Sequence, residues 1–192
     1  MVGLRERRHQ ETRDAIVDAA FALFAENGFA ETTMEQVAER AGVSRSTLYR
    51  RFASKEDIVL TVPNSWLTAW DDAVSSLDPN AGLGEALTIG CMAVARAIDD
   101  TRESVLAAYA AMAESQSLQS SSPASADWLD RSVALAKAHA PHLSDFDAMA
   151  IAGAYLGAID TMMLGWVASG GKGKVSDTTT RLLERLAPIV ED

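Results

Sequence analysis

The sequence is poor in cysteine, the residue whose disulfides cross-link small secreted domains, and in proline. Its 192 residues include five prolines and a single cysteine, Cys91, so an internal disulfide is excluded and nothing calls for an oxidising compartment. No signal-peptide pattern is recognised at the start of the sequence, where charged residues begin at Arg5. We therefore expect a cytoplasmic protein.

The usual motifs of enzyme sites are also missing. The sequence has neither a glycine-rich phosphate loop nor the elbow that carries a serine nucleophile. His139 and His142 are separated by Pro141 and lack a third nearby ligand, and Cys91 sits in an apolar run without a basic neighbour. We predict no catalytic residue, no metal, no cofactor and no enzymatic activity.

Basic residues are in the minority, with 17 Lys and Arg against 27 Asp and Glu and a net charge of −10. Residues 1–55 nevertheless hold 9 of the 17 basic residues and only 8 of the 27 acidic ones. The acidic excess therefore belongs to the rest of the chain. Such an asymmetric distribution orients a molecule on a polyanion with its basic end first.

Apolar residues recur at helical spacing along the chain, without a convincing strand or repeat, and make up 48% of it, enough for a real core. The pattern predicts an all-α protein of about nine helices, three of them before residue 55. An interior proline, Pro63, is expected to kink the fourth. The later helices are expected over 55–77, 83–99, 103–118, 126–140, 144–168 and 177–190.

The segment 32–55 has the pattern of two short helices joined by a glycine turn. Gly42 can supply the left-handed position that ends the first helix, and the Ser44 hydroxyl can cap the second. Leu48 and Phe52 then share one apolar face of the second helix. The other side chains of that helix present hydroxyl, phenol and guanidinium groups: Arg45, Ser46, Thr47, Tyr49 and Arg50.

The first helix of this pair fits a capping box in two registers, Thr33 with Gln36 or Thr32 with Glu35. A preceding helix over 11–27, closed by Gly28, completes a three-helix unit. Its expected core consists of large apolar residues from all three helices: Ile16, Leu23, Phe24, Val37, Leu48 and Phe52.

A helix, a glycine and a helix also occur in proteins that bind no DNA, so spacing alone leaves a packing role open. Two features favour DNA. Residues 42–55 contain four cations and no acid, and a basic segment with Arg5 and Arg8 precedes the first helix like an arm that follows a groove or backbone. The guanidinium groups of Arg45 and Arg50 suit guanine, with ~1–3 kcal/mol of discrimination each.

Residues 13–57 resemble the N-terminal domain of the TetR family of transcriptional regulators, most specifically through the run AGVSRSTLYRRFASKE. The resemblance implies a homodimer whose N-terminal domains bind a palindromic operator and whose C-terminal helical domains bind an inducer. It places Arg45, Ser46 and Arg50 where base edges are usually read. The positions that usually touch the DNA backbone are Thr33, Ser44, Thr47, Tyr49 and Lys55.

One departure concerns Arg50-Arg51, which stands where many members carry an aromatic residue or histidine, so the preferred bases are left open. We divide the chain into a helix-turn-helix DNA-binding domain with a basic arm over 1–55 and a helical ligand-binding and dimerisation domain over 56–192.

The expected helix over 144–168 is apolar on all sides, with Asp160 as the only charge between Ala148 and Ala168. Asp160, the glycines and the lack of basic flanks argue against a membrane span, and no membrane partner is expected. One face can line a pocket and another can meet a second subunit, and which does which is left open. The candidate interface residues are Met149, Gly153, Leu156, Gly157, Leu164, Leu182, Leu186 and Ile189.

Aromatic and thioether side chains concentrated after residue 56 suit a largely apolar ligand cavity, although each such residue is more often plain core than pocket. Asp160 could orient a ligand or pair with the other subunit. The ligand candidates are Trp66, Trp70, Tyr109, Met112, Trp128, Tyr155, Asp160, Met162 and Trp166. We predict a repressor that a small ligand releases from its operator. The alternative is a helical ligand-binding protein or enzyme in which the N-terminal motif is structural or contacts a protein.

Overall fold

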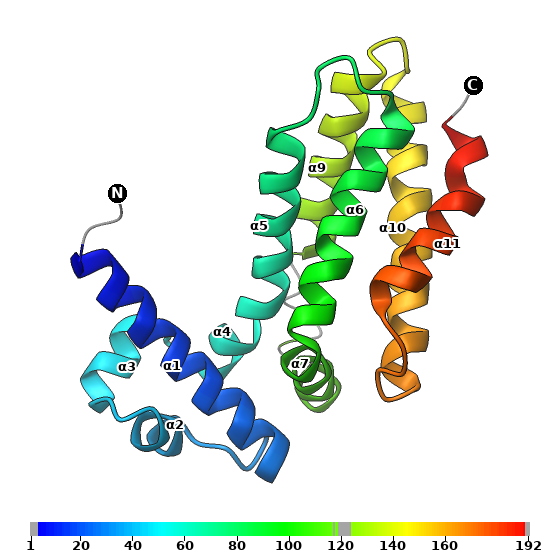
Figure 1. Cartoon of the computed structure of the whole chain (residues 1–192). Coiled ribbons are helices and arrows are strands. Elements are labelled where there is room, and N and C mark those ends of the chain that lie inside the picture. The colour runs from blue at the N-terminus through cyan, green and yellow to red at the C-terminus, as the bar shows by residue number, and fades with distance from the viewer. Residues whose placement is uncertain (1–3, 117, 119–123, 191–192) are drawn as a thin grey trace. The chain divides into compact units, whose positions relative to one another are not determined.

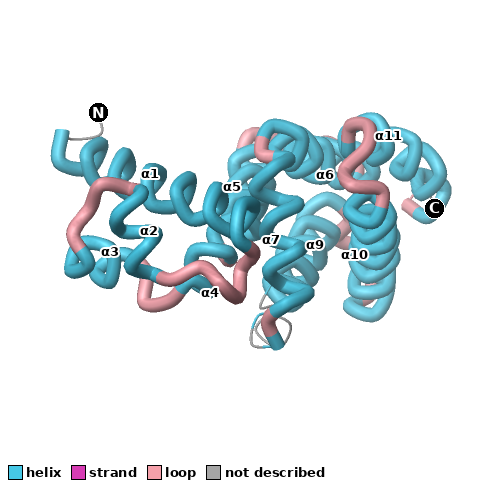
Figure 2. Tube along the Cα trace, turned by 90° about the horizontal axis from the view of Figure 1, so that it is seen from below, coloured by secondary structure: helices cyan, strands magenta, loops and turns pink. Residues whose placement is uncertain are grey.

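A computed structural model describes residues 4–116, 118 and 124–190, and the regular elements within these residues are all helical (Figures 1 and 2). The α-helices are α1 (Leu4–Asn27), α2 (Met34–Arg40), α3 (Arg45–Arg51), α4 (Lys55–Val59), α5 (Thr61–Ser75), α6 (Leu83–Asp100), α7 (Arg102–Glu114), α9 (Ala124–His139), α10 (Asp145–Ala168) and α11 (Val175–Leu186), with a 3-10 turn at Ala187–Ile189. The predicted all-α class is confirmed.

The chain forms two compact units. One comprises residues 1–62 and 103–121, and the other comprises 63–102 and 122–192. These units differ from the predicted domains, which were divided after residue 55. In the structure, α7 belongs to the same compact unit as α1 to α4. A backbone amide shows the reason directly, since Ala30 after α1 donates to Glu114 at the end of α7 (N to Oε2, 3.1 Å).

The first unit has the small core expected from the sequence. Ile16 and Leu48 are fully buried, and the four other predicted core residues are at least nine-tenths buried. Phe29 folds back on Phe24, with the ring centroids 5.1 Å apart. Large apolar side chains from three short helices thus share one centre, which gives each helix the packing partner that its own length cannot supply.

The single helix predicted over 55–77 is wrong in one respect, because the structure contains two helices separated at Leu60. A capping box of Ser54 and Asp57 begins α4, which ends after five residues. Pro63 is the third residue of α5, where its missing N–H costs no intrahelical hydrogen bond. Pro63 therefore lies at the start of a helix and does not kink the middle of one.

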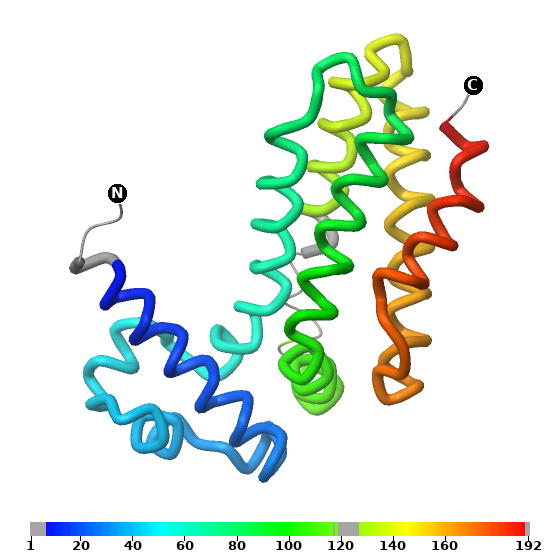
Figure 3. Tube along the Cα trace, viewed as in Figure 1, coloured from blue at the N-terminus to red at the C-terminus, as the bar shows by residue number. Residues whose placement is uncertain are grey.

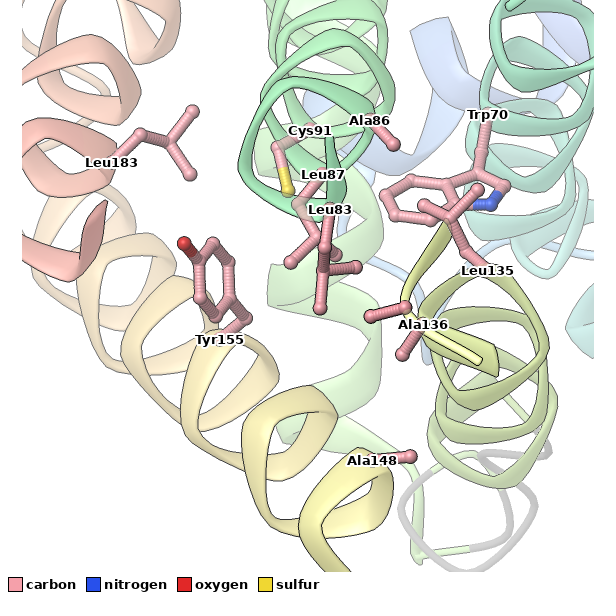
Figure 4. Close-up of a cluster of buried hydrophobic side chains, with 11 residues drawn as sticks. Trp70, Leu83, Ala86, Leu87, Cys91, Leu135, Ala136, Ala148, Tyr155 and Leu183 are labelled. Atoms are coloured by element: carbon pink, nitrogen blue, oxygen red, sulfur yellow. The ribbon is translucent and has the colours of Figure 1, made fainter. Parts of the chain in front are cut away.

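In the second unit, α6 and α10 pack against both α9 and α11, and α5 lies beside α6 (Figure 3). Trp70 of α5, Leu87 of α6 and Tyr155 of α10 point into one buried cluster (Figure 4). Among the glycines, Gly90 has the closest neighbour, since an added Cβ would lie 2.6 Å from the Trp70 ring. Cys91 belongs to the same cluster, and burial raises the pKa of its thiol to about 12.

Helix α10 has two apolar sides, of which one is buried and the other is exposed. One side is buried within its own unit through Ala148, Ala152, Tyr155, Met163 and Trp166. The other side leaves Phe146 78%, Met149 53% and Leu164 63% exposed. Among the described residues α10 is the one helix that is long and apolar enough to cross a membrane by length and composition. Its buried side packs within this unit, and its exposed side is an apolar surface of the kind that marks interaction sites.

Candidate nucleic-acid interface and ligand-domain residues

The turn between α2 and α3 is built as the sequence predicts. Gly42 has a φ of +66°, and an added Cβ there would meet nothing, so the left-handed backbone itself accounts for the glycine. The amide of Val43 donates to Ala38 (3.0 Å) and that of Gly42 to Glu39 (3.1 Å). These two bonds satisfy two carbonyls in the last turn of α2 and fix the direction in which the chain enters α3.

The start of α3 is held by Ser44. Its hydroxyl accepts the amide N–H of Thr47 at 3.2 Å and lies 3.0 Å from the Ser46 hydroxyl and 2.9 Å from that of Thr47. The predicted cap is therefore present. Three hydroxyl groups are gathered at one end of the helix, where donors to phosphate are useful.

The outer face of α3 is polar and open to solvent. Leu48 is fully buried, whereas Ser46, Tyr49 and Arg50 are exposed. The Arg45 side chain is 73% exposed, and its Nη1 lies 3.8 Å from a Glu35 oxygen. So long and open an ion pair is weak, and the guanidinium is free to exchange it for another acceptor.

Arg51 points differently from its neighbour Arg50. It is half-buried, and its Nε is a buried donor without an acceptor.

Arg40 of α2 forms an ion pair with α1, because its two terminal nitrogens each lie 2.6 Å from a Glu26 oxygen. This pair joins α2 to α1 and lowers the pKa of the Glu26 carboxyl through the Arg40 hydrogen bonds.

The basic N-terminal arm is helical where it is described. Helix α1 begins at Leu4, so Arg8 is an exposed residue of its first turns. The side chain of Arg5 lies outside the described part. Thr33 is exposed and closes the capping box with Gln36, the first of the two predicted registers. Thr32 is instead buried, and its hydroxyl donates to the Gly28 carbonyl.

Lys55 is directed onto its own chain. Its ammonium donates to the carbonyls of Phe29 (2.6 Å), Ala30 (3.0 Å) and Thr32 (3.0 Å), and it lies 4.4 Å from the centroid of the Phe29 ring. All three donors of the ammonium therefore have partners within the chain, and the expected contact of Lys55 to the DNA backbone stays a prediction.

Several ligand candidates are packed into the second unit. Trp70 and Trp128 meet edge to face with centroids 5.6 Å apart, and Tyr155 is buried in the same cluster. Burial raises the pKa of the Tyr155 phenol. The Trp166 indole donates to Gly173 (3.1 Å), which closes the turn after α10. Met162 is half-buried and its sulfur accepts the Thr179 hydroxyl.

The structure separates the remaining candidates. Tyr109 and Met112 are half-buried on α7, in the first unit, whereas Trp66 is half-buried on α5 in the second. The indole nitrogen of Trp66 is a buried donor without an acceptor. Asp160 lies on the exposed side of α10 with Leu164, away from the side that carries Tyr155, and partial desolvation raises its pKa.

The candidate interface residues on α10 largely share its exposed side. Met149, Gly153, Gly157 and Leu164 are exposed, and a Cβ added at either glycine would meet nothing within this chain. Of the remaining candidates, Ile189 is exposed, and three are half-buried: Leu156, Leu182 and Leu186.

Sequence reasoning missed a groove of about 540 Å³ in the second unit. His139 lines it and its Nδ1 lies 2.8 Å from the Ala81 carbonyl oxygen. No cluster of three metal-ligating side chains occurs among the described residues. The groove brings together segments far apart in the sequence, which no local pattern could reveal: Gly82, Leu83, His139, Ala140, His142, Leu143, Asp147, Ala150, Ile151, Ile189 and Val190.

Comparison with known proteins identifies a family match within the first unit. Residues 16–62 match the family described as bacterial regulatory proteins, tetR family. The transcriptional regulator TcmR of Streptomyces glaucescens is 46% identical over 59 residues, which are 31% of this chain and 26% of that protein. The matches span between about a quarter and less than half of the length of the first curated relatives.

Solved structures resemble the whole chain at low identity. FadR of Bacillus subtilis with stearoyl-CoA has a TM-score of 0.72 at 19% identity and covers 93% of this chain and 97% of its own. SmeT with triclosan has a TM-score of 0.73 at 18% identity, over 94% and 92% of the two chains. Such likeness supports the fold of both units.

Proposed function

We infer that this chain, which belongs to the TetR family of bacterial regulatory proteins, is a cytoplasmic repressor that binds a palindromic operator as a homodimer and leaves it when a small, largely apolar ligand binds. The observation that carries this proposal is the exposed polar face of α3, held by the Gly42 turn and the Ser44 cap. The family is one of regulators and not of enzymes.

The contacts to DNA divide by chemistry. Arg45 and Arg50 are proposed to read base edges, because a guanidinium can bind the O6 and N7 acceptors of guanine together. Ser46, which is exposed as they are, is proposed to contact base edges as well. The proposed contacts to the DNA backbone are Arg8, Thr33, Ser44, Thr47 and Tyr49.

The proposed dimer uses the exposed side of α10. Phe146, Met149 and Leu164 form an apolar surface that a single copy leaves uncovered, and Gly153 and Gly157 would let a second helix approach closely. Leu182 and Leu186 of α11 would complete a four-helix contact across a two-fold axis.

The ligand class is proposed from the second unit and from the neighbours. Aromatic side chains such as Trp66 and Trp128 are partly exposed there, and the related structures hold stearoyl-CoA or triclosan. Triclosan and the acyl chain of stearoyl-CoA are largely apolar, which matches such a lining. Acyl-CoA thioesters and triclosan are therefore the first probes for release.

The test is footprinting of the DNA upstream of this chain's own gene, together with the mass of the protein in solution. We expect a dimer and a protected palindrome whose half-sites lie about 10 base pairs apart, or a multiple of that. Affinity should fall by about 10³ to 10⁵ between ~50 and 200 mM salt if six to ten phosphates are contacted. A monomer, or a dimer that protects no sequence, would contradict the proposal.

A further inference from the structure

The groove of about 540 Å³ lies at the end of the second unit where α6 and α10 begin and where the 3-10 turn after α11 ends (Figure 1). Each of these segments contributes an apolar side chain to its walls, and these are Leu83, Ile151 and Val190. Exposed His142 and Asp147 add polar groups. Apolar walls with a few polar groups are the surroundings in which aromatic anchors of protein interfaces are found.

Phe146 lies beside this groove without lining it. It is in the first turn of α10, one helical turn before Ala150, which does line the groove, so the two side chains lie on the same side of the helix. Phe146 is nevertheless 78% exposed, the highest value among the large apolar residues that the structure describes. A phenyl ring in water and an open, largely apolar groove are therefore neighbours on one copy of the chain.

The groove also borders a concentration of exposed apolar side chains. Six large apolar residues are exposed in the described part of the chain, and four of them lie on α10 or in the turn after α11: Phe146, Met149, Leu164 and Ile189. Between Ala148 and Ala168 the one charged residue is Asp160. Because the chain carries a net charge of −10, a second copy is repelled least where neither copy presents charge. This surface therefore favours a second copy as its partner.

We propose that the groove receives the Phe146 ring of a second copy, so that each subunit of a dimer inserts one ring and accepts one. The inference rests on the proposed function, which requires a homodimer. A two-fold axis that passes the start of α10 makes the contact reciprocal, because the same patch of each copy then meets its counterpart. Pockets of about 300 Å³ already hold small ligands, so a groove of about 540 Å³ has room for a phenyl ring.

Photochemical crosslinking locates the ring. Benzoylphenylalanine in place of Phe146 keeps an aromatic group there and bonds to neighbouring C–H groups on illumination. In dimers mixed from isotope-labelled and unlabelled copies, we expect bonds between subunits that join position 146 to groove residues such as Leu143, Ile151 or Ile189. The same amino acid in place of Ala134, exposed on α9, is the matched control and should form no bond between subunits. Bonds from position 146 only to residues outside the groove, or none between subunits, would overturn the proposal.

Truncation measures what the ring contributes. Phe146→Ala should raise the dissociation constant of the dimer about 30-fold or more, as loss of an aromatic anchor from an interface pocket does. Ala150→Trp should fill the groove from its own copy and also raise the constant, and combining both changes should add little, because each removes the same contact. Ile89→Ala, which shortens an exposed apolar side chain of α6, is the control. Sedimentation over a dilution series measures the constant, and no change for Phe146→Ala contradicts the inference.

The outcomes separate this inference from the proposed function. A dimer that protects a palindrome but crosslinks outside the groove refutes the inference alone, and so does a groove occupied by a small molecule or another protein, because position 146 then forms no bond there. A dimer that crosslinks in the groove but protects no DNA refutes the proposed operator binding alone. A monomeric wild-type protein refutes both. If the truncated variants do not fold, crosslinking of the full chain, which retains the aromatic group, still decides.

Discussion

Two helices of this protein expose surfaces that their own units leave uncovered, and the surfaces are opposites. Helix α3 has seven residues and exposes guanidinium and hydroxyl groups, whereas α10 has 24 residues and exposes apolar side chains such as Leu164. Contacts to a polyanion weaken as salt rises, while apolar contacts do not. The two surfaces therefore demand different partners, and their losses should be separable by salt.

The largest effect is expected from a charge on the apolar surface. Leu164→Glu should convert the dimer to a monomer, because an unpaired carboxylate would be buried between the subunits. Operator affinity should then fall by orders of magnitude, since a monomer holds one half-site only. Analytical ultracentrifugation and operator titration measure both. Ala134→Glu, an exposed position on α9, is the matched control and should remain dimeric.

A smaller effect, limited to base preference, is expected on the other surface. Arg45→Ala should cost ~1–3 kcal/mol on the operator and much less on operators altered at the base it reads, because a bidentate contact is lost. Titration against single-base variants of the operator measures this. Lys172→Ala removes an exposed cation of the second unit and should leave base preference intact. Equal losses on all sequences for Arg45→Ala would refute base reading.

Two glycines sharpen the contrast between buried and exposed surfaces. Gly90→Ala would place a methyl group 2.6 Å from the Trp70 ring, and overpacking of this kind costs about 1–3 kcal/mol of unfolding free energy. Gly153→Ala meets nothing within the chain. Urea unfolding should show the loss for Gly90→Ala alone, and Gly153→Ala should instead weaken dimerisation. A stable Gly90→Ala would contradict this account of the core.

The smallest effect concerns pH. Desolvation raises the pKa of Asp160 above its ordinary 3.8, so the folded protein binds more protons there than the unfolded one. Its contribution to stability is therefore lost as the pH rises from about 3.8 through the raised pKa. Asp160→Asn should remove this dependence in urea unfolding series across that range.

Asp145 provides a control of opposite sign. The Lys137 hydrogen bond lowers the pKa of Asp145, so its contribution is present above 3.8 and is lost as the pH falls below that value. Asp145→Asn should therefore flatten the acid side of the profile. If both variants change the profile in the same direction, the assignment of Asp160 is wrong.

Much of the DNA-binding unit could be read from local pattern. Gly42, Ser44 and Leu48 each act within a few residues of their own position, so spacing alone predicted the turn, the cap and the buried anchor. The break before Pro63 was missed, because the pattern showed a proline but not the helix end at Leu60 that precedes it.

The second unit yielded less. Helical spacing placed Tyr155 and Leu164 on different faces of α10, but it could not tell which face the unit would bury. Asp160 illustrates the consequence, since it was proposed as a ligand contact and lies on the exposed side. The grouping of α7 with the first unit rests on contacts such as Ala30 with Glu114, between residues 84 positions apart.

The amino-acid sequence by itself determined the helix-turn-helix, because caps, a left-handed glycine and i to i+4 anchors are interactions between near neighbours. Tertiary structure alone decided that Lys55 holds three carbonyls, that α7 joins the first unit and that one side of α10 stays open. These features depend on which distant segments meet, and a local pattern does not contain that information.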